Sequence, residues 1–239
     1  MRIRRFEAEL FAANAYVVSA PNEESALIVD PGLGVTDRIK QYLHEEGLTA
    51  RAVLLTHGHA DHVWECANFD VPVYITNPDR YRLDDPLSAL LPQMRPQGVQ
   101  WRAPQDVRDL TARTVAIVPG VNVLMVPAPG HTEGSALFLM EITAGETLET
   151  NAELPSEGTG HGPVKQAQPI AFTGDVIFAG SVGRADLPGG DERQMRHTLR
   201  TLGNVIDPRT WMLPGHGPAT HWEHELATNL YVRRARSIG

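Results

Sequence analysis

Residues 56–62 read Thr-His-Gly-His-Ala-Asp-His, so four side chains that can bind a metal fall within six consecutive positions. The apolar residues 52–55 before them are typical of a short buried strand. The motif is therefore expected on the loop that leaves a strand end, where a rigid backbone supports a functional loop. Imidazole and carboxylate groups are the ligands of zinc, iron and manganese sites. No packing requirement explains four of them at this spacing, so the pattern predicts a metal site.

Three more candidate ligands follow predicted strands, each beside a glycine: His131 in Pro-Gly-His-Thr, Asp175 in Thr-Gly-Asp, and His216 in Pro-Gly-His-Gly. Glycine and proline there make sharp turns and let the backbone approach a ligand closely. The full set of candidate ligands is His57, His59, Asp61, His62, His131, Asp175 and His216. Seven ligands exceed what one tetrahedral metal needs but suit two metals that share a carboxylate, so we predict a dinuclear site.

Composition narrows the functional classes. The net charge of −8 argues against a nucleic-acid-binding protein, which usually carries a basic patch. No apolar run approaches the ~18 residues of a membrane-spanning helix. The single cysteine, Cys66, allows no internal disulfide and suits a reducing compartment. We therefore expect a cytoplasmic protein with neither nucleic-acid nor membrane partners, whose oligomeric state the sequence leaves open.

The order of apolar runs indicates one α/β domain over residues 1–239. Strands are predicted at 3–10 and 14–19 (a hairpin), 25–30, 53–56, 73–75, 121–126, 136–142, 170–173 and 211–213. Helices are predicted at 35–43, 61–68, 192–202 and 222–236. Residues 80–109 are either a surface excursion with a small apolar anchor or a lid beside the substrate. Residues 143–169 have almost no apolar side chains, so we expect a flexible insertion that packs against nothing.

The motif set resembles the metallo-β-lactamase superfamily over nearly the whole chain. Within it, Val-Asp-Pro-Gly at 29–32, Pro-Gly-His-Thr at 129–132 and Thr-Gly-Asp at 173–175 resemble the glyoxalase II branch. The segments at 180–186 and 214–217 are similar to its short bacterial relatives, which are hydroxyacylglutathione hydrolase-like. The resemblance implies an αββα four-layer sandwich of two mixed β-sheets flanked by helices, with the metals at one sheet edge.

The resemblance also implies a role for each candidate. One metal would be held by His57, His59 and His131, the other by Asp61, His62 and His216, with Asp175 bridging both. Zinc is expected, with iron or manganese as alternatives, and a metal-bound hydroxide would attack a carbonyl carbon. Asp61 and Asp175 would be the catalytic carboxylates.

Two further residues have open roles. Asp30 either orients a ligand histidine or caps the turn before Pro31. Arg184 either binds an acidic substrate or pairs with Asp186 to brace its loop, and the recurrence of Gly-Arg-x-Asp among proteins of different activity favours bracing.

The expected activity is hydrolysis of a thioester of a small thiol. The residues that grip glutathione in glyoxalase II have no assignable counterparts, so the acyl carrier stays open, and another ester or a lactone is an alternative substrate. A second alternative is a mononuclear-iron enzyme resembling persulfide dioxygenases. An RNA-processing nuclease is disfavoured because it would need a basic exosite, which the sequence does not show. A non-enzymatic metal-binding scaffold is disfavoured because it would not require an open groove with two metals.

Overall fold

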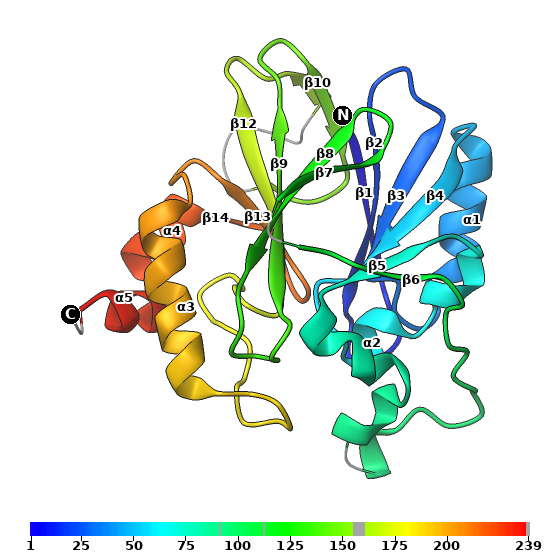
Figure 1. Ribbon diagram of the computed structural model, residues 1–239. Coiled ribbons are helices and arrows are strands. Elements are labelled where there is room, and N and C mark those ends of the chain that lie inside the picture. The colour runs from blue at the N-terminus through cyan, green and yellow to red at the C-terminus, as the bar shows by residue number, and fades with distance from the viewer. Residues whose placement is uncertain (91, 112, 155–160, 238–239) are drawn as a thin grey trace.

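Two β-sheets lie face to face, and helices cover their outer sides (Figure 1). The computed structural model describes residues 1–90, 92–111, 113–154 and 161–237. Both sheets are mixed, because each contains parallel and antiparallel pairs. The predicted four-layer αββα sandwich is therefore confirmed.

The first sheet has the strand order β11-β10-β1-β2-β3-β4-β5-β6. Its strands are β1 (Arg2–Glu7), β2 (Asn14–Ser19), β3 (Ser25–Val29), β4 (Thr49–Leu54), β5 (Val73–Ile75), β6 (Val107–Asp109), β10 (Thr147–Thr150) and β11 (His161–Pro163). β1 and β2 form the predicted antiparallel hairpin, whereas β3 to β6 run parallel.

The second sheet has the order β14-β13-β12-β9-β8-β7. Its strands are β7 (Thr114–Val118), β8 (Val121–Pro127), β9 (Ala136–Ile142), β12 (Gln168–Gly174), β13 (Trp211–Pro214) and β14 (Thr220–His221). The helices are α1 (Thr36–Glu45), α2 (Ala60–Val63), α3 (Glu192–Val205), α4 (Trp222–Thr228) and α5 (Leu230–Ser237), with 3₁₀ turns η1 (Cys66–Phe69), η2 (Asn77–Leu83), η3 (Pro86–Ala89) and η4 (Pro92–Met94). None of the described helices is long and apolar enough to cross a membrane.

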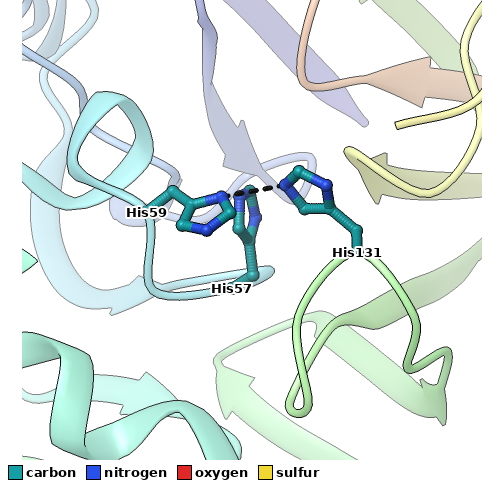
Figure 2. Close-up of side chains that lie close together, drawn as sticks. All are labelled: His57, His59 and His131. Carbon is teal, nitrogen blue, oxygen red and sulfur yellow. Dashed lines mark hydrogen bonds between the residues drawn. The ribbon is translucent and has the colours of Figure 1, made fainter. Parts of the chain in front are cut away.

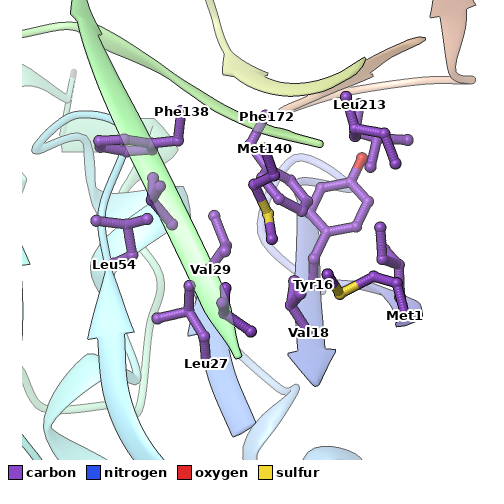
Figure 3. Packing of buried hydrophobic residues seen from close by; sticks show 14 of the residues in the cluster. Met1, Tyr16, Val18, Leu27, Val29, Leu54, Phe138, Met140, Phe172 and Leu213 are labelled. Carbon is purple, nitrogen blue, oxygen red and sulfur yellow. The ribbon is translucent and has the colours of Figure 1, made fainter. Parts of the chain in front are cut away.

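The central strands are continuous apolar runs because both of their faces are buried. In β3, Leu27 and Val29 join the core between the two sheets, whereas Ala26 and Ile28 join the core beneath α1. In β12, Phe172 faces the inner core and Ala171 faces the core beneath α3 and α5. Figure 3 shows the inner core, where side chains of both sheets interdigitate. A polar side chain buried within such a strand needs a partner, as Thr173 of β12 finds in the Ile177 carbonyl at 2.8 Å.

The expectation that residues 143–169 pack against nothing is wrong for the part that the structure describes. β10 pairs in parallel with β1, and β11 pairs with β10. Leu148 and Ala152 are buried in the inner core, 2% and 5% exposed. A buried leucine, a buried alanine and backbone pairing with β1 thus hold a segment of low overall hydropathy against the sheet. Residues 155–160 lie outside the described residues.

The predicted helix over 222–236 is two helices, α4 and α5, separated at Asn229. The Asn229 backbone is extended, with φ −66° and ψ 115°. Its side-chain oxygen accepts a hydrogen bond from the backbone N–H of Tyr231 at 3.0 Å, and its amide donates to Glu225 at 2.8 Å and to the Ser181 carbonyl at 3.0 Å. A short polar side chain that bonds nearby backbone competes with helix continuation, which explains the break.

We predict that Leu148→Ala lowers the free energy of unfolding by about 2–4 kcal/mol, because it leaves a cavity in a packed core. Denaturant unfolding of the full chain measures this. Leu230→Ala is the matched control, since Leu230 is 58% exposed and its loss should change stability by less than about 0.5 kcal/mol. Equal midpoints for the two variants would contradict the burial of β10.

Candidate metal centre

The seven candidate ligands come together at one end of the sheet sandwich, on segments that follow strands of both sheets. His57 and His59 lie on the loop after β4, Asp61 and His62 on α2, His131 after β8, Asp175 after β12 and His216 after β13. Six are buried, and His216 is one-quarter exposed. The two sheets therefore each contribute to one cluster.

The first ligand group is His57, His59 and His131, whose ligand atoms all lie within 4.8 Å of one another. Figure 2 shows the three rings turned toward a common point, with His59 Nδ1 2.9 Å from His131 Nε2. His57 Nε2 is buried and has no hydrogen-bond partner among the described residues. A buried nitrogen without a partner is costly unless a ligand or metal occupies it.

Burial keeps two of these imidazoles neutral. Desolvation, aided by the neighbouring histidines, lowers the pKa of His57 well below its usual range and that of His59 to about 3. A neutral imidazole keeps a lone pair on one ring nitrogen, which is the form that binds a metal.

The second ligand group is Asp61, His62 and His216. His62 Nε2 lies 3.4 Å from His216 Nε2, and Asp61 Oδ2 lies 3.2 Å from His216 Nε2 and 3.6 Å from His62 Nε2. Burial alone would lower the pKa values of both histidines, but the carboxylates Asp175 and Asp61 outweigh it. The pKa of His62 rises well above its usual range and that of His216 rises to about 9.

Asp175 lies between the two groups. Its Oδ2 is 3.6 Å from His131 Nε2 and 3.4 Å from His216 Nε2, and its Oδ1 is 3.2 Å from His62 Nε2. Burial would raise the Asp175 pKa, but His62 and His216 hold it well below its usual range. The Asp175 carboxylate is buried and contacts histidines of both ligand groups, so it has the position that a bridging ligand requires.

Asp30 orients one ligand histidine from behind. Its carboxylate accepts hydrogen bonds from the Thr56 backbone N–H at 2.8 Å and the Thr56 hydroxyl at 2.6 Å, and Oδ2 lies 3.0 Å from His62 Nδ1. Both Asp30 oxygens are thus engaged, and His62 Nε2 is left facing the centre. Asp30 has φ +48°, an uncommon left-handed conformation that these bonds sustain.

Backbone oxygens fix two more ligands in the same way. His131 Nδ1 lies 2.7 Å from the Arg184 carbonyl, and His216 Nδ1 lies 3.0 Å from the Phe11 carbonyl. Donation from Nδ1 leaves Nε2 as the free nitrogen, which sets both the tautomer and the orientation of the ring. The Phe11 carbonyl is aimed by two successive left-handed residues, Phe11 (φ 54°) and Ala12 (φ 55°).

Asp79, a residue that the sequence reasoning missed, joins the loops of the first group. Its fully buried carboxylate accepts hydrogen bonds from the Gly58 N–H at 2.8 Å, the Thr132 hydroxyl at 2.7 Å and the Gly134 N–H at 2.7 Å. Gly58 lies between His57 and His59, and Thr132 follows His131. One carboxylate therefore sets the separation of the two loops.

No local signal marks Asp79. It follows a proline at the start of η2, where an aspartate ordinarily serves only the helix N-terminus. Its partners lie 21, 53 and 55 positions away along the chain. The buried Arg82 side chain, 3.4 Å away, balances its charge and binds Glu133 at 2.6 Å.

Gly183 and Gly215 are required by close packing at the centre. A Cβ on Gly215 would overlap Asp175 Oδ1 and lie 2.6 Å from His62 Cε1. A Cβ on Gly183 would overlap the Asp175 carbonyl. Gly215, which precedes the candidate ligand His216, therefore permits the close approach that its sequence motif predicted, and Gly183 does the same from a loop without a candidate ligand.

A pocket of about 640 Å³ opens over the centre. His59, Asp61, His131, Asp175 and His216 line it, together with Phe11, Ala60, Ser88, Ala89, Leu90, Met94, Phe178, Gly183, Arg184, Asp186, Leu187 and Pro188. Residues 88–90 and Met94 thus border the pocket, as the lid interpretation of 80–109 expected. Trp101 of the same segment packs on Trp64 with ring centroids 5.8 Å apart, which is the anchor that the other interpretation expected.

Arg184 and Asp186 form the internal ion pair that the sequence favoured. Arg184 Nε lies 2.6 Å from Asp186 Oδ1, and Arg184 Nη2 lies 2.8 Å from Asp186 Oδ2. Both side chains are more than half exposed, so the pair contributes little to stability but neutralises the charge of each partner.

The donor set fits two divalent cations. Three inward nitrogens form one group, two nitrogens and a carboxylate form the other, and a second carboxylate lies between them. Nitrogen and oxygen donors of this kind suit zinc, iron or manganese.

We predict that Asp79→Asn weakens metal binding about 10- to 100-fold, because an amide cannot accept all three hydrogen bonds that hold the two loops. Metal affinity measured by chelator competition checks this. Asp84→Asn in the same segment, where Asp84 is exposed, should keep the wild-type affinity. Unchanged affinity in the Asp79 variant would show that the loops are set without it.

Comparison with known proteins identifies the family. The model of the metallo-beta-lactamase superfamily matches residues 8–216. A Mycobacterium tuberculosis protein, Rv2581c, is 35% identical over 227 residues, which cover 92% of each chain. A Bacillus subtilis protein named "Probable metallo-hydrolase YqgX" is 30% identical, again over 92% of each chain. The Haemophilus influenzae hydroxyacylglutathione hydrolase GloC is 28% identical over 88% of this chain and 89% of its own.

Solved structures agree. TTHA1623, described in a di-iron-bound form, superposes with a TM-score of 0.70 and 28% identity over 95% of this chain and 98% of its own. The B3 metallo-beta-lactamase BLEG-1 gives a TM-score of 0.71 and 27% identity over 96% and 99%. The metal-binding groups, the four-layer sandwich and the match over most of the sequence lead to one conclusion: this chain belongs to the metallo-β-lactamase superfamily.

Proposed function

We propose that the protein is a dinuclear metallohydrolase that cleaves thioesters of a small thiol. The observation that carries the proposal is the pairing of two complete ligand groups with one carboxylate between them, at the base of a pocket large enough for a small molecule. The pocket and both ligand groups share His59, Asp61, His131 and His216, so a bound substrate would lie directly against the metals.

In this proposal His57, His59 and His131 would hold one ion, Asp61, His62 and His216 would hold the second, and Asp175 would serve both. Zinc is the proposed metal, with iron or manganese as alternatives. Two such ions supply a water molecule of lowered pKa and a Lewis acid that polarises a carbonyl group.

The chain's own residues position the reactants. Asp61 lies at the base of the pocket, where its carboxylate can orient a water molecule and accept a proton from it. Asp175 ties the histidines of the two sheets together, so both groups face the same space. The apolar walls, among them Phe178 and Leu187, exclude bulk water, which strengthens electrostatic interactions with a developing oxyanion.

Thioesters are proposed ahead of other esters and lactones because GloC, a similar protein, is a hydroxyacylglutathione hydrolase. The second ligand group favours hydrolysis over dioxygenation at a single iron. One iron bound by the first group would leave Asp61, His62 and His216 without a metal to bind. A cytoplasmic location remains a prediction. Burial raises the pKa of Cys66 to about 12 and keeps its thiol unreactive, so Cys66 takes no part in the proposed chemistry.

We predict two metal ions per chain in the active protein and hydrolysis of thioesters in a panel that also contains lactones, β-lactams and phosphodiesters. Elemental analysis and product assays measure both quantities on the same preparation. One iron per chain, with oxygen uptake on a persulfide and no hydrolysis, would overturn the proposal.

We predict that His59→Ala abolishes binding at the first group and lowers kcat/KM at least 10³-fold, because one of its three nitrogen donors is lost. Elemental analysis and thioester hydrolysis measure the two effects. His224→Ala is the matched control, since His224 is exposed on α4 and should keep both metal and activity. Full activity of the His59 variant would refute the ligand assignment.

A further inference from the structure

We infer that the substrate carries an uncharged, apolar acyl group, which the pocket over the metal centre binds along a wall formed by Leu90, Met94, Phe178 and Leu187. This inference rests on the proposed function and names the substrate class of the same site. It concerns the acyl group of the substrate, whose chemistry the candidate metal ligands do not determine.

The first argument is charge. Apart from the candidate metal ligands, Arg184 and Asp186 are the charged side chains among the described residues that line the pocket. They bind each other through two contacts of 2.6 and 2.8 Å. Away from the metal ions, a carboxylate on the acyl group would find no unpaired cationic side chain among these residues, and it would lose hydration on entering the apolar part of the pocket.

The second argument is the apolar surface that the pocket exposes. Met94 is 38% exposed and Phe11 43% exposed, although both are large hydrophobic side chains. Both line the pocket, although they come from segments far apart along the chain. Phe178 also lines it, and its ring centroid is 5.8 Å from that of the candidate ligand His216. Apolar side chains that gather around a polar centre mark a ligand site, because a monomer gains nothing by exposing them there.

The third argument is size and rigidity. A pocket of about 640 Å³ exceeds what an acetyl or lactoyl group needs. The backbone of Phe11 is held by the contact of its carbonyl with His216 Nδ1 at 3.0 Å, and its side chain lines the pocket. A chain of several carbons starting at the metal centre would lie against the apolar side chains that line the pocket, among them Phe178 and Met94.

The experiment compares thioesters of N-acetylcysteamine that differ only in the acyl group: acetyl, butyryl, hexanoyl and succinyl. We expect kcat/KM to rise about two- to fourfold per added methylene, as for burial of apolar surface, and succinyl to be hydrolysed more slowly than butyryl. Equal rates along the series, or a preference for succinyl, would overturn the inference and leave the hydrolase proposal intact.

Met94→Ala should lower the hexanoyl-to-acetyl ratio of kcat/KM about fivefold, because it removes part of the wall that only the longer chain reaches. Val99→Ala is the matched control: Val99 is also 38% exposed, belongs to the same segment and lies outside the described lining of this pocket. The inference is contradicted if both variants keep the wild-type ratio.

A binding measurement keeps the inference testable without turnover. Calorimetry on the metal-loaded protein with the S-methyl and S-hexyl thioethers of N-acetylcysteamine should give tighter binding and a more negative heat-capacity change for S-hexyl. If no thioester or ester is hydrolysed, the proposed function fails, and this measurement still decides whether the pocket binds apolar chains. Equal affinities for the two thioethers would overturn the inference.

Discussion

Burial of both faces of the central strands is the constraint on which the rest of this structure depends. In β3 and β12, successive apolar side chains enter different hydrophobic cores, and Thr173, a buried polar residue of β12, is tolerated because its hydroxyl donates a hydrogen bond to the Ile177 carbonyl at 2.8 Å. An unpaired polar group placed there would cost about 1–3 kcal/mol. Polar chemistry is therefore confined to the segments that follow the last apolar residue of each strand. The position of the metal centre follows from the way the sheets are packed.

Buried carboxylates then give the centre its precision. Asp30 holds Thr56 and His62, and Asp79 holds the loops that carry His57, His59 and His131. Neither lines the pocket over the centre. Each satisfies several donors at once, which is how buried charge is tolerated in a protein interior. The ligands are thus oriented before any ion binds, and a smaller part of the binding energy is needed to arrange them.

Much of the site could be predicted from the sequence because four ligands are contiguous and the others follow glycine-marked strand ends. The αββα fold was predicted from the resemblance of those motifs to the metallo-β-lactamase superfamily. Asp79 could not be predicted, because its hydrogen bonds reach Gly58, Thr132 and Gly134, which are distant along the chain. β10 was missed because a single leucine, Leu148, supplies most of its burial, too little to stand out in a polar segment. The helix break at Asn229 depends on hydrogen bonds with Ser181 and Glu225. The spacing of apolar residues along the sequence carries no information about these contacts, so one continuous helix was predicted.

The distribution of ligands between the sheets has a thermodynamic consequence. His57, His59, Asp61 and His62 follow a strand of the first sheet, whereas His131, Asp175 and His216 follow strands of the second. An ion held by both sets acts as a cross-link across the sandwich, and ligand binding to the native state alone stabilises it in proportion to the logarithm of the free ligand concentration. The stability of the packed sheets toward unfolding therefore depends on the concentration of free metal around the protein. Metal scarcity would accordingly lower the free energy of unfolding of the chain as well as remove the ions that its proposed chemistry requires.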